Sequence, residues 1–188
     1  MKLMKKNALL LIALGTSAIV FAQGKFYTKT GRISFYSSAK LEDITAVNRS
    51  VVTLLDAKTG DLQFAVLMKG FEFRKALMQE HFNKSYVESD KYPRSEFKGQ
   101  IVNNASVNYG ADKAYPVTAE GRLTIHGVTK EVSVPGTLTV KNGKVTINAV
   151  FNILLADYNI AIPKMYRDNI SKSIQITVEE TLEPLRES

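Results

Sequence analysis

Two histidines are the side chains of this chain best suited to metal binding or to acid–base chemistry. His81 directly follows Glu80, and His126 directly precedes Gly127. A zinc site needs three or four ligands at suitable spacing, and the sequence supplies no such set around either histidine. The helical zinc motif pairs two histidines, which the Glu80-His81 segment lacks. The pattern therefore predicts neither a metal site nor a cofactor.

Nucleophilic catalysis is disfavoured on similar grounds. A serine hydrolase needs a serine that a histidine activates and an acid orients, and no Gly-x-Ser-x-Gly segment is present to hold one. The chain has no cysteine, which excludes thiolate nucleophiles, thiolate metal sites and disulfides. Glu179 and Glu180 are adjacent near the end of an expected strand, and we interpret both as solvated charge. We expect no catalytic residue and no enzymatic activity.

The N-terminus has the three parts of a secretory signal peptide. Lysines occupy positions 2, 5 and 6, residues 8–21 are almost all apolar, and Val20-Phe21-Ala22 ends in a small side chain. A bilayer span takes about 20 apolar residues, so this run is too short for a membrane anchor. We predict that residues 1–22 are removed after export and that residues 23–188 form one exported domain.

The charge of the chain points away from nucleic acid. The full chain carries +7, but three of its lysines belong to the predicted signal peptide, which leaves 22 basic and 18 acidic residues, or +4. No basic run longer than two residues remains, whereas nucleic-acid binding needs a clustered basic surface. A weakly basic exported protein is attracted to anionic lipid surfaces, so transient membrane contact is compatible with this composition.

Alternation of apolar and polar residues with a period of two dominates the rest of the chain, which is typical of half-buried strands. It is clearest in Val117–Ile125, Val132–Val140 and Val145–Ile153. Asn142-Gly143 lies between the last two runs, and Asn-Gly at such a position is a strong hairpin signal. Shorter segments of strand character are Arg32–Ser37, Leu41–Val47, Val51–Leu55, Leu62–Met68 and Ser173–Val178.

One segment departs from this period. Arg74–Tyr86 contains no glycine, proline or valine, and its apolar residues recur at helical spacing. It is predicted to form a short amphipathic helix, either a lid over one end of the domain or a permanent plug. Eight or so antiparallel strands with one short helix predict an all-β fold, either a closed barrel or a sandwich. Of the two we expect the barrel, an extended antiparallel β-barrel similar in shape to the lipocalins.

The interior of such a barrel is either filled by side chains or holds one small ligand. Several inward positions are small, namely Ala119, Gly121, Gly136 and Ala149, which is compatible with a cavity, although a close-packed core is the more usual interior. The side chains that we expect to bind a ligand are large apolar residues on the inner face and around the helix, with one tyrosine near the rim. They are Phe64, Phe71, Phe73, Leu77, Phe82, Leu123, Leu138, Ile147, Phe151 and Tyr158.

Several motifs occur in an order and spacing that resemble the YceI-like family over roughly residues 30–180. They are Glu80-His81-Phe82-Asn83, the segment from Glu88 to Pro93, Leu123–Lys130 and Asp157-Tyr158-Asn159-Ile160. The resemblance implies an exported, non-enzymatic barrel that holds a polyisoprenoid, a quinone or a fatty-acid derivative as carrier or buffer. The alternative is an envelope-stress or protein-interaction module whose barrel is filled.

Overall fold

The computed structural model describes residues 24–38, 43–164 and 170–185. The predicted signal peptide, residues 1–22, lies outside the described residues, and so do the first two residues of the predicted strand Leu41–Val47. Within the described part of the chain, no helix is long and apolar enough to cross a lipid bilayer.

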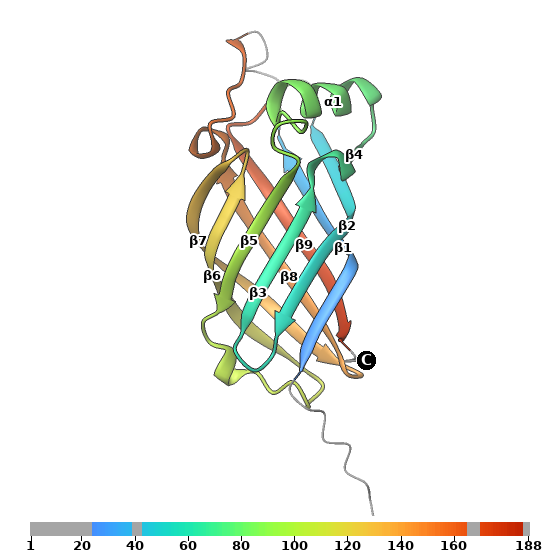
Figure 1. Ribbon diagram of the computed structural model, residues 1–188, viewed down its shortest axis with the longest axis vertical. Coiled ribbons are helices and arrows are strands. Elements are labelled where there is room, and N and C mark those ends of the chain that lie inside the picture. Colours follow the sequence, from blue (N-terminus) through green and yellow to red (C-terminus); the bar gives the residue numbers. More distant parts are fainter. Residues whose placement is uncertain (1–23, 39–42, 165–169, 186–188) are drawn as a thin grey trace, which may run out of the picture.

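The described strands are antiparallel and close into a barrel (Figure 1). They are β1 (Lys25–Ser37), β2 (Ile44–Asp56), β3 (Asp61–Leu67), β4 (Glu72–Phe73), β5 (Arg94–Ile101), β6 (Lys113–Ile125), β7 (Val128–Lys141), β8 (Lys144–Leu154) and β9 (Ser173–Pro184). Neighbours pair in the order β1-β9-β8-β7-β6-β5-β3-β2, and β1 also pairs with β2. The eight long strands therefore form a ring without a free edge, and the short β4 pairs only with β2.

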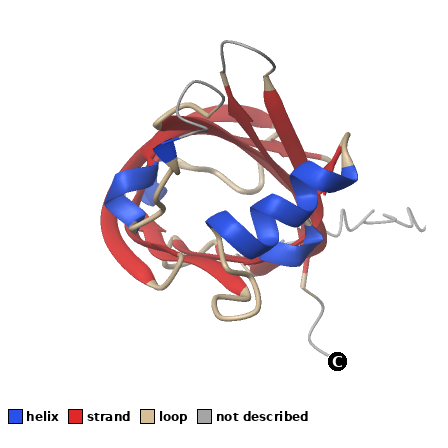
Figure 2. Cartoon of the chain, turned by 90° about the horizontal axis from the view of Figure 1, so that it is seen from above, coloured by secondary structure: helices blue, strands red, loops and turns tan. Residues whose placement is uncertain are grey.

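Short helical segments gather mainly at one end of this barrel, which we call the mouth (Figure 2). They are η1 (Met68–Gly70), α1 (Ala76–His81), η2 (Phe82–Tyr86) and η4 (Leu155–Tyr158), whereas η3 (Asn104–Ser106) lies at the opposite end. α1 and η2 are continuous, so the predicted helical segment is confirmed, although it begins at Ala76. The predicted barrel with one short helical segment is confirmed as well.

Two tight hairpins show why the sequence folds locally as it does. The turn between β6 and β7 contains His126 and Gly127, with φ of 52° and 73°, and the turn between β7 and β8 contains Asn142 and Gly143, with φ of 52° and 71°. Both central residues of a type I′ turn need positive φ, and its twist matches that of the flanking strands. The Asn142-Gly143 hairpin is therefore confirmed, and His126-Gly127 makes an equivalent turn.

The predicted strands differ from the structure in their bounds, since β1 and β9 are longer than predicted, and also in two larger errors. Leu41–Val47 and Val51–Leu55 belong to the single strand β2, because the chain continues through a bulge at Arg49-Ser50 without turning. Asn48 is buried there, accepts from the Ser50 N–H at 2.9 Å and donates to the Leu67 carbonyl at 2.9 Å. The polar segment looks like a turn in sequence, but the Asn48 side chain satisfies the backbone that the bulge leaves unpaired.

The second error is the omission of β5. Its inward positions are Ser95, Phe97, Gly99 and Ile101, so the apolar alternation is interrupted by a serine and a glycine. Gly99 lies opposite Gly121 of β6, and a Cβ on either glycine would overlap the backbone of the other strand. The glycine pair therefore allows a close approach of two strands that larger side chains would prevent.

The end of the barrel opposite the mouth is filled. Leu55, Leu138 and Leu182 are fully buried and lie among other buried aliphatic side chains of the core. Phe26 stacks on Tyr109 with ring centroids 5.8 Å apart, and the Tyr109 hydroxyl donates to the Asn104 side chain at 2.7 Å. Loops and aromatic rings thus close this end, and free space is left only toward the mouth.

Candidate lipid-binding cavity

The mouth half of the barrel surrounds an apolar cavity of about 580 Å³. This volume lies within the range of about 300–1,000 Å³ that is usual for small-molecule sites. Along β6 its wall runs from Ile125 near the mouth to Val117. Eight residue steps at about 3.4 Å each give a path of about 27 Å along the strand, which the usual tilt of barrel strands shortens to about 20 Å along the barrel axis. The cavity is therefore long for its volume, which suits an extended chain better than a compact ring system.

Small side chains on the inner face create part of this space. Ala119, Gly136 and Ala149 all line the cavity, as the sequence predicts. Gly121 is not part of the wall, because its role is the close approach to Gly99. The barrel is therefore neither completely filled nor completely hollow. The half away from the mouth is packed with side chains, and the half next to the mouth is open.

A cluster of phenylalanines closes one side of the mouth. Phe35 of β1, Phe71, Phe73 of β4 and Phe82 of η2 have neighbouring ring centroids 5.1–5.8 Å apart. Ring pairs at such distances attract each other beyond simple burial. No residue of α1 is buried. Phe82 and Tyr86 of η2 both pack against the core, so η2 attaches the helical segment to the barrel.

Leu77 on α1 occupies a special position at the opening. Its side chain is 61% exposed and yet it lines the cavity, so it contacts both the interior and the solvent. α1 has only six residues and no side-chain hydrogen bond at its N-cap. A helix this short has little stability of its own in water, so its position depends on contacts with the barrel.

The polar part of the wall lies at the mouth. Lys75 and His81 come from the helical segment, and Ser95 and Glu96 begin β5 next to it. Deeper wall positions on the described strands carry aliphatic or aromatic side chains or glycine. A ligand in this cavity would therefore meet charged groups only near its entrance.

Eight of the ten expected ligand-binding residues lie on the wall of this cavity, and two do not. Leu138 is fully buried in the filled half, and the Tyr158 side chain is buried beside the cavity without lining it. Whether any of them touches a ligand stays a prediction. The eight on the wall are Phe64, Phe71, Phe73, Leu77, Phe82, Leu123, Ile147 and Phe151.

The sequence interpretation missed other wall residues. Phe97 belongs to the unpredicted strand β5, so its inward direction was not foreseen. Phe35 could have been predicted, because it follows Ile33 by two residues in a predicted strand and therefore lies on the same face. Both residues line the cavity.

His126 connects three segments around the mouth. Its Nδ1 lies 3.1 Å from the Tyr158 carbonyl, and its Nε2 lies 2.8 Å from the Glu88 carboxylate. The Tyr92 ring meets the imidazole edge-on at 4.5 Å between centroids. The histidine thus ties the β6–β7 turn to η4 and to the loop after η2, which is a structural role. Within the described residues, no three histidine or acidic side chains gather as a metal site would require.

The interpretation of Glu180 as solvated charge was wrong. Glu179 points outward and pairs with Arg32, whereas Glu180 points inward and is fully buried. Its Oε2 accepts a hydrogen bond from the Thr53 hydroxyl at 3.3 Å, and its Oε1 has no hydrogen-bond partner. Burial raises the pKa of Glu180 to about 8, so the carboxyl is protonated at neutral pH.

Comparison with known proteins identifies the family. A model of the YceI-like domain matches residues 14–182, which is most of the chain. The chain belongs to the YceI-like family. The match begins inside the predicted signal peptide and ends within β9, so the whole YceI-like barrel except the end of its last strand is covered.

Solved structures from three bacteria share the YceI-like fold. A polyisoprenoid-binding domain from Saccharophagus degradans, implicated in plant cell wall breakdown, has a TM-score of 0.76 and 14% identity, covering 87% of this chain and 100% of that domain. BcnA from Burkholderia cenocepacia has a TM-score of 0.65 and 19% identity, covering 81% and 95%. The YceI protein of Campylobacter jejuni has a TM-score of 0.53 and 14% identity, covering 100% and 94%. No curated protein matches the sequence.

Proposed function

We propose that this YceI-like barrel holds one molecule of a long apolar lipid and carries or buffers it between membranes of the cell envelope. The observation that carries the proposal is the long cavity, which is apolar along its depth and polar only at its mouth. The polyisoprenoid-binding domain of similar fold supports a ligand of that class. The cavity counts against the alternative of an interaction module with a completely filled barrel.

The energetics favour exchange over permanent storage. Moving an alkyl chain from water into an apolar site contributes about 0.8 kcal/mol per methylene. A membrane lipid, however, starts in surroundings as apolar as the cavity wall, so most of this contribution cancels. Net transfer close to balance lets the barrel both take up and release its ligand, as a carrier must.

The segment α1–η2 is the proposed lid. Leu77 reaches into the opening from a helix with no buried residue, while Phe82 attaches the segment to the phenylalanine cluster. Rotation of α1 about this attachment would uncover the mouth without breaking the barrel. Transient contact of the mouth with a membrane would then let a lipid pass between bilayer and cavity.

Export belongs to the same proposal. The N-terminal pattern of residues 1–22 supports a cleaved signal peptide, and a carrier between envelope membranes would work in the periplasm. The weakly positive charge expected after cleavage is compatible with brief visits to anionic lipid.

The decisive experiment is mass spectrometry of an organic extract from protein purified natively from its host, together with the native mass of the intact protein. A near-stoichiometric isoprenoid, quinone or fatty-chain species would support the proposal and identify the ligand. Lipid-free protein that also refuses added isoprenoids would refute it.

A matched pair of variants tests the lid. Leu77→Ser changes the residue at the opening, and Leu67→Ser changes a leucine that is 49% exposed and lies outside the cavity wall. We expect Leu77→Ser to alter the rate of lipid transfer from labelled vesicles several-fold and Leu67→Ser to leave it unchanged. Equal rates in both variants and the wild type would contradict the lid.

A further inference from the structure

Glu180 lies directly behind the inner part of the cavity wall. On β9 it is the next inward-pointing residue after Val178, farther from the mouth, and Val178 lines the cavity. Its register partner on β8 is Ile147, another wall residue. Thr53 is likewise opposite Phe64 of the wall. The contact between Glu180 and Thr53 therefore lies at the depth where the wall ends on β8 and β9, whereas on β3 the wall continues one inward position deeper, to Leu62.

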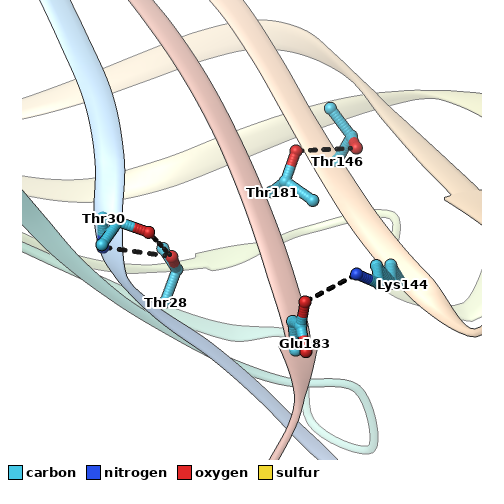
Figure 3. A network of polar contacts seen from close by, with 6 residues as sticks. All are labelled: Thr28, Thr30, Lys144, Thr146, Thr181 and Glu183. Carbon is cyan, nitrogen blue, oxygen red and sulfur yellow. Dashed lines mark hydrogen bonds and ion pairs between the residues drawn. The ribbon is translucent and has the colours of Figure 1, made fainter. Parts of the chain in front are cut away.

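The chain makes room for this carboxyl inside the barrel. A Cβ on Gly31 would overlap the Glu180 carboxyl group, so only glycine is compatible with its position. Gly31 follows a bulge of β1 in which Thr28 accepts from the Thr30 N–H at 3.3 Å, as Figure 3 shows. The Thr28 hydroxyl is also 3.5 Å from that of Thr30, so it is directed along its own strand.

A buried oxygen without a partner requires an explanation, because native interiors leave few such groups unsatisfied. The Glu180 Oε1 is one of these, in a side chain that is fully buried. An ordered water would satisfy it, and so would an oxygen atom of a ligand that reaches the end of the cavity. The neighbouring wall is apolar, and the strand register places the Glu180 carboxyl and the Thr53 hydroxyl directly behind it.

We propose that Glu180, supported by Thr53, is a polar subsite that binds an uncharged oxygen at the leading end of the lipid. The subsite rests on the proposed lipid binding and makes it more specific. It selects long apolar chains that end in an alcohol, ketone or quinone oxygen over hydrocarbons of the same length, and it places that oxygen inward.

The chemistry of the subsite follows from its surroundings. With Oε2 accepting from Thr53, the proton of the neutral carboxyl resides on Oε1 and is available to a ligand oxygen. The elements packed against the carboxyl present uncharged groups, namely Gly31 of β1, Thr53 of β2 and Ile147 of β8. Among the described residues, no cation lies against this carboxyl to balance a carboxylate or phosphate, so an anionic head group stays at the mouth near Lys75 and His81.

The depth of a polar group in the barrel decides whether its contact with a ligand distinguishes an alcohol from a hydrocarbon. Groups at the mouth contact water with or without a ligand, so a head group there exchanges one set of hydrogen bonds for another. A buried group behind the wall is out of contact with bulk water, so a ligand without an oxygen that fills the site leaves it unsatisfied. Sites that hydrogen-bond a substrate in this way discriminate strongly against analogues without the polar atom.

The test compares two probes, the C20 isoprenoid alcohol geranylgeraniol and the same chain without the hydroxyl, by displacement of a fluorescent apolar dye from the purified protein. Wild type, Glu180→Gln and Glu180→Leu are measured, because glutamine keeps a donor and an acceptor whereas leucine has neither. We expect the affinity ratio of alcohol to hydrocarbon to be about tenfold higher in wild type and Glu180→Gln than in Glu180→Leu. Taking this ratio between variants cancels the different water solubilities of the probes.

Infrared difference spectra of the wild type provide a test that needs no variant. The C=O stretch of a protonated carboxyl should shift when the alcohol binds and stay unchanged when the hydrocarbon binds. An equal affinity ratio in all folded variants, or a carboxyl band indifferent to both probes, would mean that a water satisfies Glu180, and the subsite is overturned while lipid binding stands. If neither probe binds to the wild type, the proposed function itself fails.

Discussion

Replacing Glu180 by glutamine should remove a large part of the pH dependence of folding stability in the lipid-free protein. In the folded chain, burial raises the pKa of Glu180 from 4.5 to about 8, with a small opposing effect of the Thr53 hydroxyl. The unfolded chain releases this proton near pH 4.5, whereas the folded chain keeps it until about pH 8. Between these values the unfolded state binds fewer protons, so the free energy of unfolding falls as the pH rises.

The magnitude follows from the size of the shift. Each pH unit within this window lowers the free energy of unfolding by about 1.4 kcal/mol. Between pH 5 and pH 7 the wild type should therefore lose about 3 kcal/mol through this one group. Glu180→Gln is uncharged throughout, so it should be the more stable protein at pH 7 and nearly equal to the wild type at pH 5.

Urea unfolding followed by circular dichroism at several pH values measures this difference. Glu179→Gln is the matched control, because the neighbouring carboxylate points outward and pairs with Arg32 at the surface. It should keep the slope of the wild type. Parallel stability curves for the wild type and Glu180→Gln would refute the reasoning, since they would show that Glu180 ionises in the folded barrel as it does in the unfolded chain.

Three further substitutions test other parts of the fold. Gly121→Ala should lower the free energy of unfolding by about 1–3 kcal/mol in urea titrations, because the added methyl meets the Gly99 backbone; an unchanged midpoint would contradict the close approach. His126→Asn tolerates the positive φ but loses the contact with Glu88, so hydrogen exchange should accelerate in the loop after η2. Unchanged exchange there would mean that the histidine does not hold this loop. Leu138→Ala should cost about 2–5 kcal/mol and leave lipid affinity unchanged, since Leu138 packs in the filled half. A clear loss of lipid affinity in a normally folded Leu138→Ala variant would show that Leu138 lines the cavity.

The barrel could be predicted from the sequence because apolar and polar residues alternate regularly in its long strands and its hairpins carry turn residues with positive φ. Most of β6, β7 and β8 was predicted for this reason, although β6 and β7 each begin four residues before the predicted strand. β2 and β5 were not, since a bulge at Arg49-Ser50 resembles a turn and a glycine at position 99 interrupts the apolar face. The errors offset each other in the number of strands, as one strand was divided and another was missed.

The candidate site was predictable only in part. Alternation shows which side chains point inward, and it found Leu123, Ile147 and Phe151 on the wall. It cannot show how far along the barrel the packing ends, so Leu138 was placed on the wall although it lies in the filled half. Glu180 was misjudged because adjacent acids near a strand end are usually solvated, and only the contact with Gly31 shows the space that it occupies.

The closure of the ring has a consequence for the order of folding. The Leu185 N–H donates to the Lys25 carbonyl at 2.7 Å, and β9 fits between β1 and β8. A chain that ends before Ser173 would leave two long strands with unpaired backbone edges, which invite pairing with other chains. The contacts of β9 with β1 bridge almost the whole described sequence. The ring can therefore close only when β9 is available, and closure through such distant contacts should slow folding.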